Sequence, residues 1–160
     1  MAAGKSTIGR LLSERLELPF VDSDTEIERA FGMIVAEIFR TSGEAEFREA
    51  EKGIIAGLLD GNPKVIAVGG GAFVDARTRE TLVESTRTVW LDPGFDLILS
   101  RVAQSATRPL ASACSDQELR QLWQERRACY AQAQLRIDGF EDDPRRTVDK
   151  IIGILGAEQA

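Results

Sequence analysis

Short apolar runs alternate along this chain with longer segments whose apolar residues recur at helical spacing. The apolar runs, each typical of a short buried strand, lie at residues 18–21, 65–68, 88–91 and 135–137. Segments with the helical period lie at about residues 5–16, 44–59, 118–130 and 144–155. Because strands that alternate with helices are joined by crossover connections, this order predicts an α/β fold with a parallel sheet.

Capping residues mark two of the helix starts. Ser115 and Glu118 have the spacing of a capping box, in which each side chain satisfies a backbone N–H of the other residue. Asp143 precedes Pro144, and proline suits the first position of a helix because its missing N–H needs no partner there. The stretch at about 104–116 has no clear period, which predicts a surface loop that acts as a lid.

Composition and charge narrow the class of protein. A length of 160 residues with 43% hydrophobic content suits a single domain over residues 1–160. The net charge of −6 argues against a broad nucleic-acid interface, and no apolar run approaches the ~20 residues that cross a membrane. Two cysteines and no histidine exclude a disulfide framework and hydrolases that use a Ser-His pair. We therefore expect a cytoplasmic, reduced protein.

A phosphate-binding sequence opens the chain. Gly4-Lys5-Ser6-Thr7, followed at once by a helix, is typical of the second half of a P-loop. Such a loop holds phosphate with backbone N–H groups, places a lysine on the β- and γ-phosphates and a hydroxyl on Mg²⁺. The alternative is an ordinary capped surface helix. The complete motif would begin before Met1, so we expect roughly ten residues, two from the loop and one strand, to be missing.

Several charged residues are candidates for binding the acceptor of the phosphoryl group. Asp22 and Asp24 follow the first strand, where one carboxylate suits a metal-linked role and the other suits an acceptor hydroxyl. Alternatively, Asp24 only caps the next helix. Glu44, Arg48 and Glu51 share one helix face, as either a solvated ion-pair ladder or an arginine that binds a substrate carboxylate and is oriented by an acid.

Other candidate residues lie further along the chain. Gly69 to Gly71 follow a strand, where three glycines are costly unless the backbone approaches another group closely. Arg108, in the lid, would neutralise a transferring phosphate, or is an unconnected surface residue. Arg126 and Tyr130, four residues apart on one helix, are weak evidence individually.

Taken together, these motifs resemble those of the shikimate kinases, a branch of the nucleoside-monophosphate-kinase-like P-loop proteins. The likeness covers nearly the whole chain and rests on Gly4-Lys5-Ser6-Thr7, Asp22-x-Asp24, Gly43-Glu44-x-x-Phe47-Arg48-x-x-Glu51, Gly69-Gly70-Gly71, Arg108-Pro109-Leu110 and Arg126-x-x-x-Tyr130. The resemblance implies a three-layer α/β/α fold with a parallel sheet in the order 2-3-1-4-5, whose first, central strand is missing here. Without that strand, backbone groups stay unpaired, so we expect this chain as written to be poorly stable and nearly inactive.

The resemblance also implies the reaction ATP + shikimate → ADP + shikimate 3-phosphate. It implies Mg²⁺ as cofactor, and we expect a monomer with no nucleic-acid or membrane partner. Lys5, Asp24 and Arg108 would be catalytic, and Ser6 and Asp22 would hold the metal. The implied ATP site comprises Ala2, Ala3, Gly4, Lys5, Ser6, Thr7, Arg101, Arg108 and Pro144. The implied shikimate site comprises Asp24, Arg48, Glu51, Gly70, Gly71 and Arg126, with a shikimate-binding helical region at about 24–59.

Two other interpretations stay open at this point. One is another small-molecule P-loop kinase of the gluconate type, which we expect not to need two carboxylate-binding arginines. The other is a nucleotide-binding module that is catalytically impaired because its N-terminus is truncated. Comparison of shikimate with its carboxamide as substrates separates the first alternative from a shikimate kinase.

Overall fold

The computed structural model describes residues 3–103, 115–138 and 143–157. Its contacts divide the chain into two compact units, which we call the middle unit (residues 9–85) and the flanking unit (residues 1–8 with 86–160). The prediction of one domain over residues 1–160 stays a prediction. No helix among the described residues is long and apolar enough to span a membrane.

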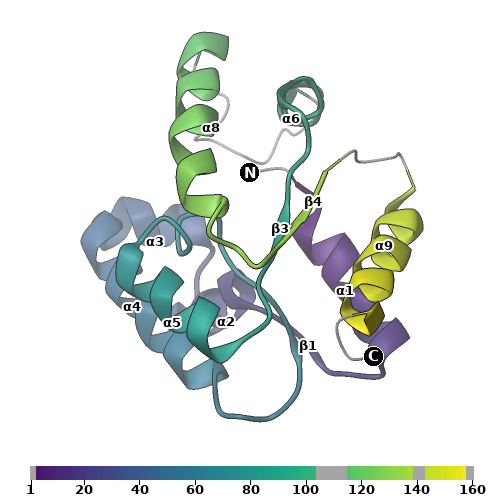
Figure 1. The fold of residues 1–160 in the computed structure, drawn as a ribbon. Coiled ribbons are helices and arrows are strands. Elements are labelled where there is room, and N and C mark those ends of the chain that lie inside the picture. Colours follow the sequence, from purple (N-terminus) through teal and green to yellow (C-terminus); the bar gives the residue numbers. More distant parts are fainter. Residues whose placement is uncertain (1–2, 104–114, 139–142, 158–160) are drawn as a thin grey trace. The chain divides into compact units, whose positions relative to one another are not determined.

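The middle unit contains two strands and five helices (Figure 1), and three of the helices come between the two strands in the chain. In chain order its elements are α1 (Lys5–Leu16, shared with the flanking unit), β1 (Phe20–Asp22), α2 (Ser23–Phe31), α3 (Val35–Thr41), α4 (Gly43–Leu58), β2 (Val65–Ala67) and α5 (Ala76–Ser85). Strands β1 and β2 are parallel, with Asp22 opposite Ala67. Both strands therefore end at the same edge, so the residues that follow them are neighbours.

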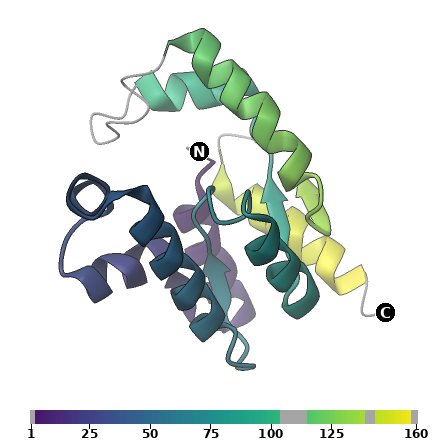
Figure 2. The ribbon, with the colours of Figure 1, turned by 90° about the vertical axis from the view of Figure 1, so that its left-hand side faces the viewer.

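Helices α2, α3 and α4 lie side by side (Figure 2), and apolar packing holds them together. Ile27, Ile38 and Phe47, one from each helix, are fully or almost fully buried against one another. Elsewhere in this unit, α1 packs closely on β1, because a Cβ at Gly9 would lie 2.5 Å from the Phe20 ring. These contacts hold α4 in place, and with it the charged side chains that α4 carries.

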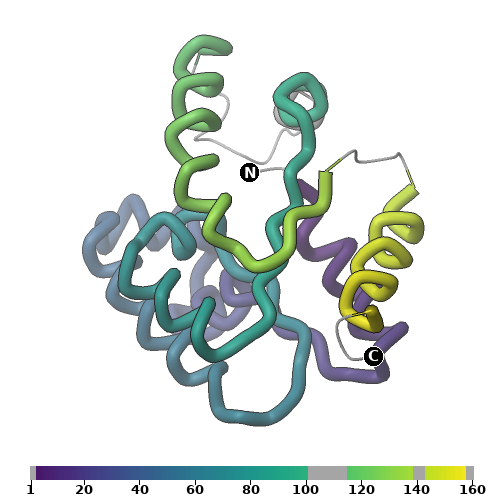
Figure 3. Tube along the Cα trace, viewed as in Figure 1, coloured from purple at the N-terminus to yellow at the C-terminus, as the bar shows by residue number. Residues whose placement is uncertain are grey.

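The flanking unit holds the other strand pair and three helices. Its elements after residue 86 are β3 (Val89–Leu91), α6 (Phe95–Ala103), α8 (Asp116–Tyr130), β4 (Leu135–Ile137) and α9 (Pro144–Ala157). Strands β3 and β4 are parallel, with Leu91 opposite Ile137. Figure 3 follows the chain from β3 into α6 and from the end of α8 into β4. The C-terminal end of β3 therefore leads into α6, whereas the N-terminal end of β4 follows α8.

The predicted elements are largely confirmed. Three of the four strands lie within the predicted runs, and β1 extends one residue beyond its run, to Asp22. Helices α1, α4, α8 and α9 begin within a few residues of their predicted starts. The capping box at Ser115 and Glu118 is present with both of its hydrogen bonds, and Pro144 is the first residue of α9. The lid predicted at about 104–116 lies mostly outside the described residues. The strand pairs are neighbours in the predicted sheet order, but the full order and the missing central strand stay predictions.

Candidate active site

The junction of β1 and α2 brings carboxylates to the edge of the sheet. The Asp22 carboxylate caps α2 by accepting a hydrogen bond from the backbone N–H of Asp24 at 3.1 Å. The alternative in which Asp24 is the helix cap is therefore wrong. Between them, Ser23 is completely buried, and its hydroxyl oxygen accepts from the N–H of Gly69 at 3.2 Å. This long-range hydrogen bond ties the start of α2 to the glycine-rich turn after β2.

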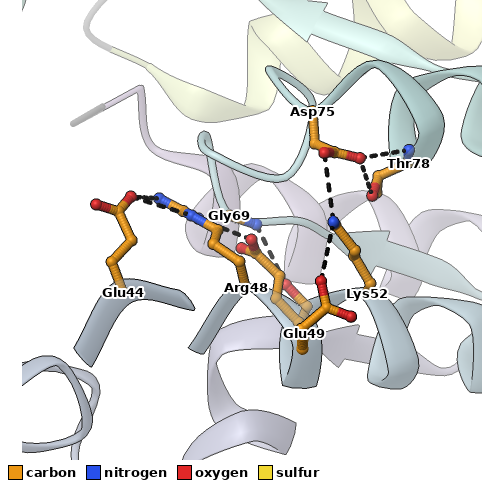
Figure 4. Close-up of polar contacts among 9 residues, drawn as sticks. Glu44, Arg48, Glu49, Lys52, Gly69, Asp75 and Thr78 are labelled. Atoms are coloured by element: carbon orange, nitrogen blue, oxygen red, sulfur yellow. Dashed lines mark hydrogen bonds and ion pairs between the residues drawn. The ribbon is translucent and has the colours of Figure 1, made fainter. Parts of the chain in front are cut away.

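Figure 4 shows Glu44 and Arg48 on the charged face of α4, whose side chains differ in burial. Arg48 donates to Glu51 at 2.7 Å and to Glu44 at 3.3 Å. The exposed fractions of these side chains are 3% for Glu51, 29% for Arg48 and 69% for Glu44. A solvated ladder would expose all three side chains. The buried carboxylate instead holds one side of the guanidinium, which fits an acid that orients an arginine.

The pKa shifts of Glu51 and Arg48 reflect the burial of their side chains and their charged neighbours. Burial raises the pKa of Glu51, although its hydrogen bond and charge interaction with Arg48 oppose the rise, and Asp24 adds to it. For Arg48, burial lowers the pKa, but the hydrogen bonds and charges of Glu51 and Glu44 raise it overall. The arginine therefore stays cationic, and the carboxylate of Asp24 is close enough to act on Glu51.

Two aromatic rings lie next to the Arg48 guanidinium. The Arg48 guanidinium carbon lies 5.2 Å from the centre of the Phe47 ring and 5.9 Å from that of Phe39. The two rings are themselves packed at 4.5 Å between centroids. Cation–π contacts of this kind reduce the freedom of a long side chain, so Arg48 is positioned before any ligand binds.

The glycines after β2 leave room for these charged groups. A Cβ added at Gly69 would lie 2.8 Å from a Glu51 carboxylate oxygen and 2.9 Å from one of Asp24. A Cβ at Gly71 would overlap the Arg48 guanidinium. The predicted close approach at this turn is thus explained, at these two positions, by the side chains of Asp24, Arg48 and Glu51. Gly70 lies between them in the same turn.

Sequence reasoning missed the residues that hold the far end of this turn. Asp75 caps α5 by accepting from the backbone N–H and the hydroxyl of Thr78, both at 2.9 Å. Lys52 of α4 pairs with Asp75 (Figure 4), with 3.6 Å between Nζ and a carboxylate oxygen. Arg79 donates to the carbonyl oxygens of residues 73 and 74. The Asp75-x-x-Thr78 spacing is itself a capping signal and would have indicated the start of α5.

The P-loop residues lie at the start of α1, in the flanking unit. Ala3 is buried, and Gly4 has a φ of 79°, in the region that favours glycine. Lys5 is half-buried, whereas Ser6 and Thr7, in the same first helical turn, are exposed. Their backbone N–H groups belong to the end of a helix that carries partial positive charge, so this turn is suited to a phosphate group.

Of the other predicted site residues, the structure describes Arg126 and Pro144. Arg126 lies half-buried on α8 and hydrogen-bonds to Tyr130, whose pKa is raised by burial and lowered in part by this arginine. Pro144 starts α9 next to its cap, since Asp143 accepts from the backbone N–H of Arg145 at 2.9 Å. Ala2, Arg108 and the side chain of Arg101 lie outside the described residues.

A metal site built from protein side chains alone is not seen in the part of the chain that the structure describes. There, no three histidine, cysteine, aspartate or glutamate side chains come together in a way that would hold an ion. The predicted pair of metal ligands is different in kind, because Ser6 offers a hydroxyl and Asp22 a carboxylate. Both are oxygen donors, and Mg²⁺ accepts few protein ligands when phosphates and waters supply the others. The donor chemistry fits Mg²⁺.

Comparisons with known proteins agree on one family. The shikimate kinase family matches residues 1–155. The shikimate kinase of Bradyrhizobium diazoefficiens is 43% identical over 158 residues, which are 98% of this chain and 76% of that protein. That of Rhodopseudomonas palustris is 43% identical over 156 residues, 97% of this chain and 77% of that protein.

Solved structures give the same result. A shikimate kinase from Acinetobacter baumannii in complex with shikimate is 35% identical, with a TM-score of 0.92 over 99% of this chain and 89% of that one. The enzyme from Aquifex aeolicus is 33% identical, with a TM-score of 0.84 over 99% of this chain and 93% of that one. Sequence, fold and the charged face of α4 thus agree, and the chain belongs to the shikimate kinase family.

Proposed function

We propose that this chain transfers the γ-phosphoryl group of ATP to the 3-hydroxyl of shikimate, and that Arg48 binds the shikimate carboxylate. The observation that carries the proposal is the Arg48–Glu51 pair, in which a buried carboxylate orients a guanidinium that stays partly exposed. A guanidinium held in this way suits two parallel hydrogen bonds to a second carboxylate. A neutral acceptor would give Arg48 no such partner.

Asp24 is the residue that we assign to the acceptor hydroxyl. Its carboxylate lies beside the glycine-rich turn and close to Glu51, at the edge where both parallel strands end. In phosphoryl transfer, an aspartate orients the attacking hydroxyl and accepts its proton. Backbone N–H groups of Gly70 and Gly71 would add hydrogen bonds to the same substrate. Arg126 of α8 is assigned to the substrate carboxylate on the strength of the family resemblance.

The nucleotide is assigned to the start of α1. The N–H groups of Ala3, Gly4, Ser6 and Thr7 would surround phosphate oxygens, and Lys5 would neutralise the β- and γ-phosphates. Ala2 would complete this loop. Arg108 of the lid would stabilise the transferring group, and water excluded by lid closure would no longer hydrolyse ATP. Arg101 and Pro144 are assigned to the adenine.

Mg²⁺ is assigned to Ser6 and Asp22 as an ion that arrives with ATP. When bound, Mg²⁺ draws negative charge from the phosphates and so eases attack by the acceptor oxygen. Ser6 would contribute its hydroxyl directly and Asp22 its carboxylate through water. Chelation of divalent ions with EDTA is therefore a control for the activity test, and should remove all activity that depends on shikimate.

The test of this function is ADP release by the purified chain with Mg·ATP, with and without shikimate. We expect release that depends on shikimate, together with shikimate 3-phosphate in the product mixture by mass spectrometry. Product analysis detects even slow turnover, so the test holds if the chain is as inactive as the sequence predicts. ADP release that is the same without shikimate, and no phosphorylated shikimate, would contradict the proposal and favour the impaired nucleotide-binding module.

Substitution of Gly71 by alanine tests the packing of the turn against Arg48. The added methyl group would overlap the end of a flexible side chain, so the guanidinium must move while the backbone stays in place. We expect the KM for shikimate to rise about tenfold, the loss of roughly one charged hydrogen bond, with little change in Tm or in the KM for ATP.

Gly53→Ala is the matched control for this experiment. Gly53 lies in α4, and a Cβ there would meet no atom within 4 Å. Because alanine is the better helix former, this variant should be more stable by about 0.5–1 kcal/mol with unchanged kinetics. If Gly71→Ala shows the same unchanged KM for shikimate, the contact with Arg48 has no role in binding.

A further inference from the structure

A buried carboxylate of the flanking unit has no assigned role in the reaction. Asp92 directly follows β3, and its side chain is only 4% exposed. It accepts from Nη1 of Arg127 at 2.9 Å, and from Nε and Nη2 of Arg136 at 3.0 and 2.8 Å. Its backbone N–H donates to the carbonyl oxygen of Ile137 at 2.9 Å. One aspartate therefore joins β3 to an arginine of α8 and to an arginine of β4.

An aromatic ring extends this cluster along α8. The guanidinium groups of Arg127 and Arg136 lie over the Trp90 ring, at 5.1 and 5.0 Å from its centre. The same Trp90 ring packs against the ring of Tyr130 at 6.1 Å. Tyr130 in turn is hydrogen-bonded to Arg126. Two routes thus connect Asp92 to Arg126: the adjacent residue Arg127, and the Trp90–Tyr130 contact.

Apolar packing contributes little to holding α8. Among its residues, all of which the structure describes, Leu119 is the buried one. The ring of Trp123 also lies 5.5 Å from that of Phe95, where α6 and α8 approach each other in Figure 2. A helix with so small a buried face is free to rotate or tilt unless polar contacts fix it. The ion pair of Arg127 with Asp92 is such a contact, because its carboxylate is itself buried and would be costly to leave unpaired.

We propose that Asp92 is a positioning residue for Arg126: it fixes the rotation of α8 about its axis and thereby the direction in which Arg126 points. The proposal rests on the proposed function, which assigns Arg126 to the shikimate carboxylate. Rotation of a helix by about ten degrees displaces the end of an arginine side chain by more than about an ångström, and misplacement of that size weakens a bidentate contact strongly. Asp92 itself would not touch the substrate.

The first test is Asp92→Asn, which keeps the size of the side chain and one oxygen acceptor but removes the charge. We expect the KM for shikimate to rise about five- to tenfold, while kcat and the KM for ATP change less than twofold. Asp138→Asn is the matched control, because Asp138 also lies near Arg136, at 3.9 Å, but is 73% exposed. Its kinetics should be those of the unaltered chain.

A double-variant cycle separates this inference from the proposed function. Arg126→Met alone should raise the KM for shikimate, and Asp92→Asn should add nothing in that background, because the residue it positions is gone. If Arg126→Met leaves this KM unchanged, the assigned role of Arg126 is wrong and the inference falls with it. If only Asp92→Asn leaves it unchanged, the inference alone is overturned.

A Tm measurement tests whether Asp92 has only a structural role. Removal of the charge from Asp92 leaves two arginines without their carboxylate, so the Tm of Asp92→Asn is measured alongside its kinetics. A lower Tm with equal losses in the kinetic parameters for ATP and shikimate would overturn the inference. If Asp92→Asn does not fold, Arg127→Gln replaces it, since it leaves the Asp92–Arg136 pair intact. The same selective rise in the KM for shikimate is then expected.

Discussion

Replacement of Asp24 by asparagine is expected to lower kcat by about two to four orders of magnitude, the usual contribution of a positioned acid or base. Asparagine has the same shape but is neutral, so it neither accepts the proton of the 3-hydroxyl nor attracts it electrostatically. The hydrogen bond from the Asp24 backbone N–H to Asp22 does not involve the altered side chain, so the start of α2 should be preserved. Shikimate-dependent ADP release measures the effect.

Glu26→Gln is the control for this substitution. Asp24 and Glu26 are the acidic residues in the first turn of α2, so each variant removes one negative charge from the same helix end. Glu26 pairs with Arg29 on the surface and should contribute little to activity. The affinity for ATP, measured by calorimetry, should be unchanged in both variants. A kcat for Asp24→Asn within threefold of that for Glu26→Gln contradicts the role assigned to Asp24.

The elements that the sequence predicted are those whose signal is local. The capping box at Ser115 and the Asp143-Pro144 pair are satisfied by residues within one turn, so their spacing was sufficient. Helix α5 was missed because it is mostly polar, with Thr78 and Leu82 its buried residues, and a polar helix has almost no period to detect. Its cap, Asp75, was overlooked because residues 77–81, which follow it in the first turns, are all polar and do not suggest a helix.

In the candidate site, too, the sequence predicted contacts within one helix but not contacts between distant parts of the chain. Orientation of Arg48 by Glu51 was predicted because both residues lie on one helix, where spacing fixes which side chains are neighbours. The hydrogen bond from Gly69 to Ser23 joins residues 46 positions apart in the chain, and no local pattern encodes it. Likewise, the burial of Glu51 and of Asp92 depends on what other elements place around them, so the sequence alone did not distinguish them from surface acids.

Replacement of Arg48 by methionine is expected to lower kcat/KM for shikimate about 30-fold or more, which corresponds to about 2 kcal/mol. Methionine keeps the apolar stem near Phe39 and Phe47 but removes both the charge and the hydrogen-bonding fork. Shikimate carboxamide makes the test specific to the carboxylate. The unaltered chain should strongly prefer shikimate to its carboxamide, and Arg48→Met should lose most of that preference, because the discriminating cation is gone.

Lys52→Met provides the matched control for Arg48. Lys52 lies on the same helix, carries the same charge and also pairs with two carboxylates, Glu49 at 3.1 Å and Asp75 at 3.6 Å. Its side chain is 37% exposed, and surface pairs of this kind contribute about 0–1 kcal/mol, so kcat/KM should stay within about twofold. A general loss of positive charge from α4 would affect both variants equally. If Arg48→Met still discriminates shikimate from the carboxamide as the unaltered chain does, another cation recognises the carboxylate and Arg48 serves only to pair with Glu51.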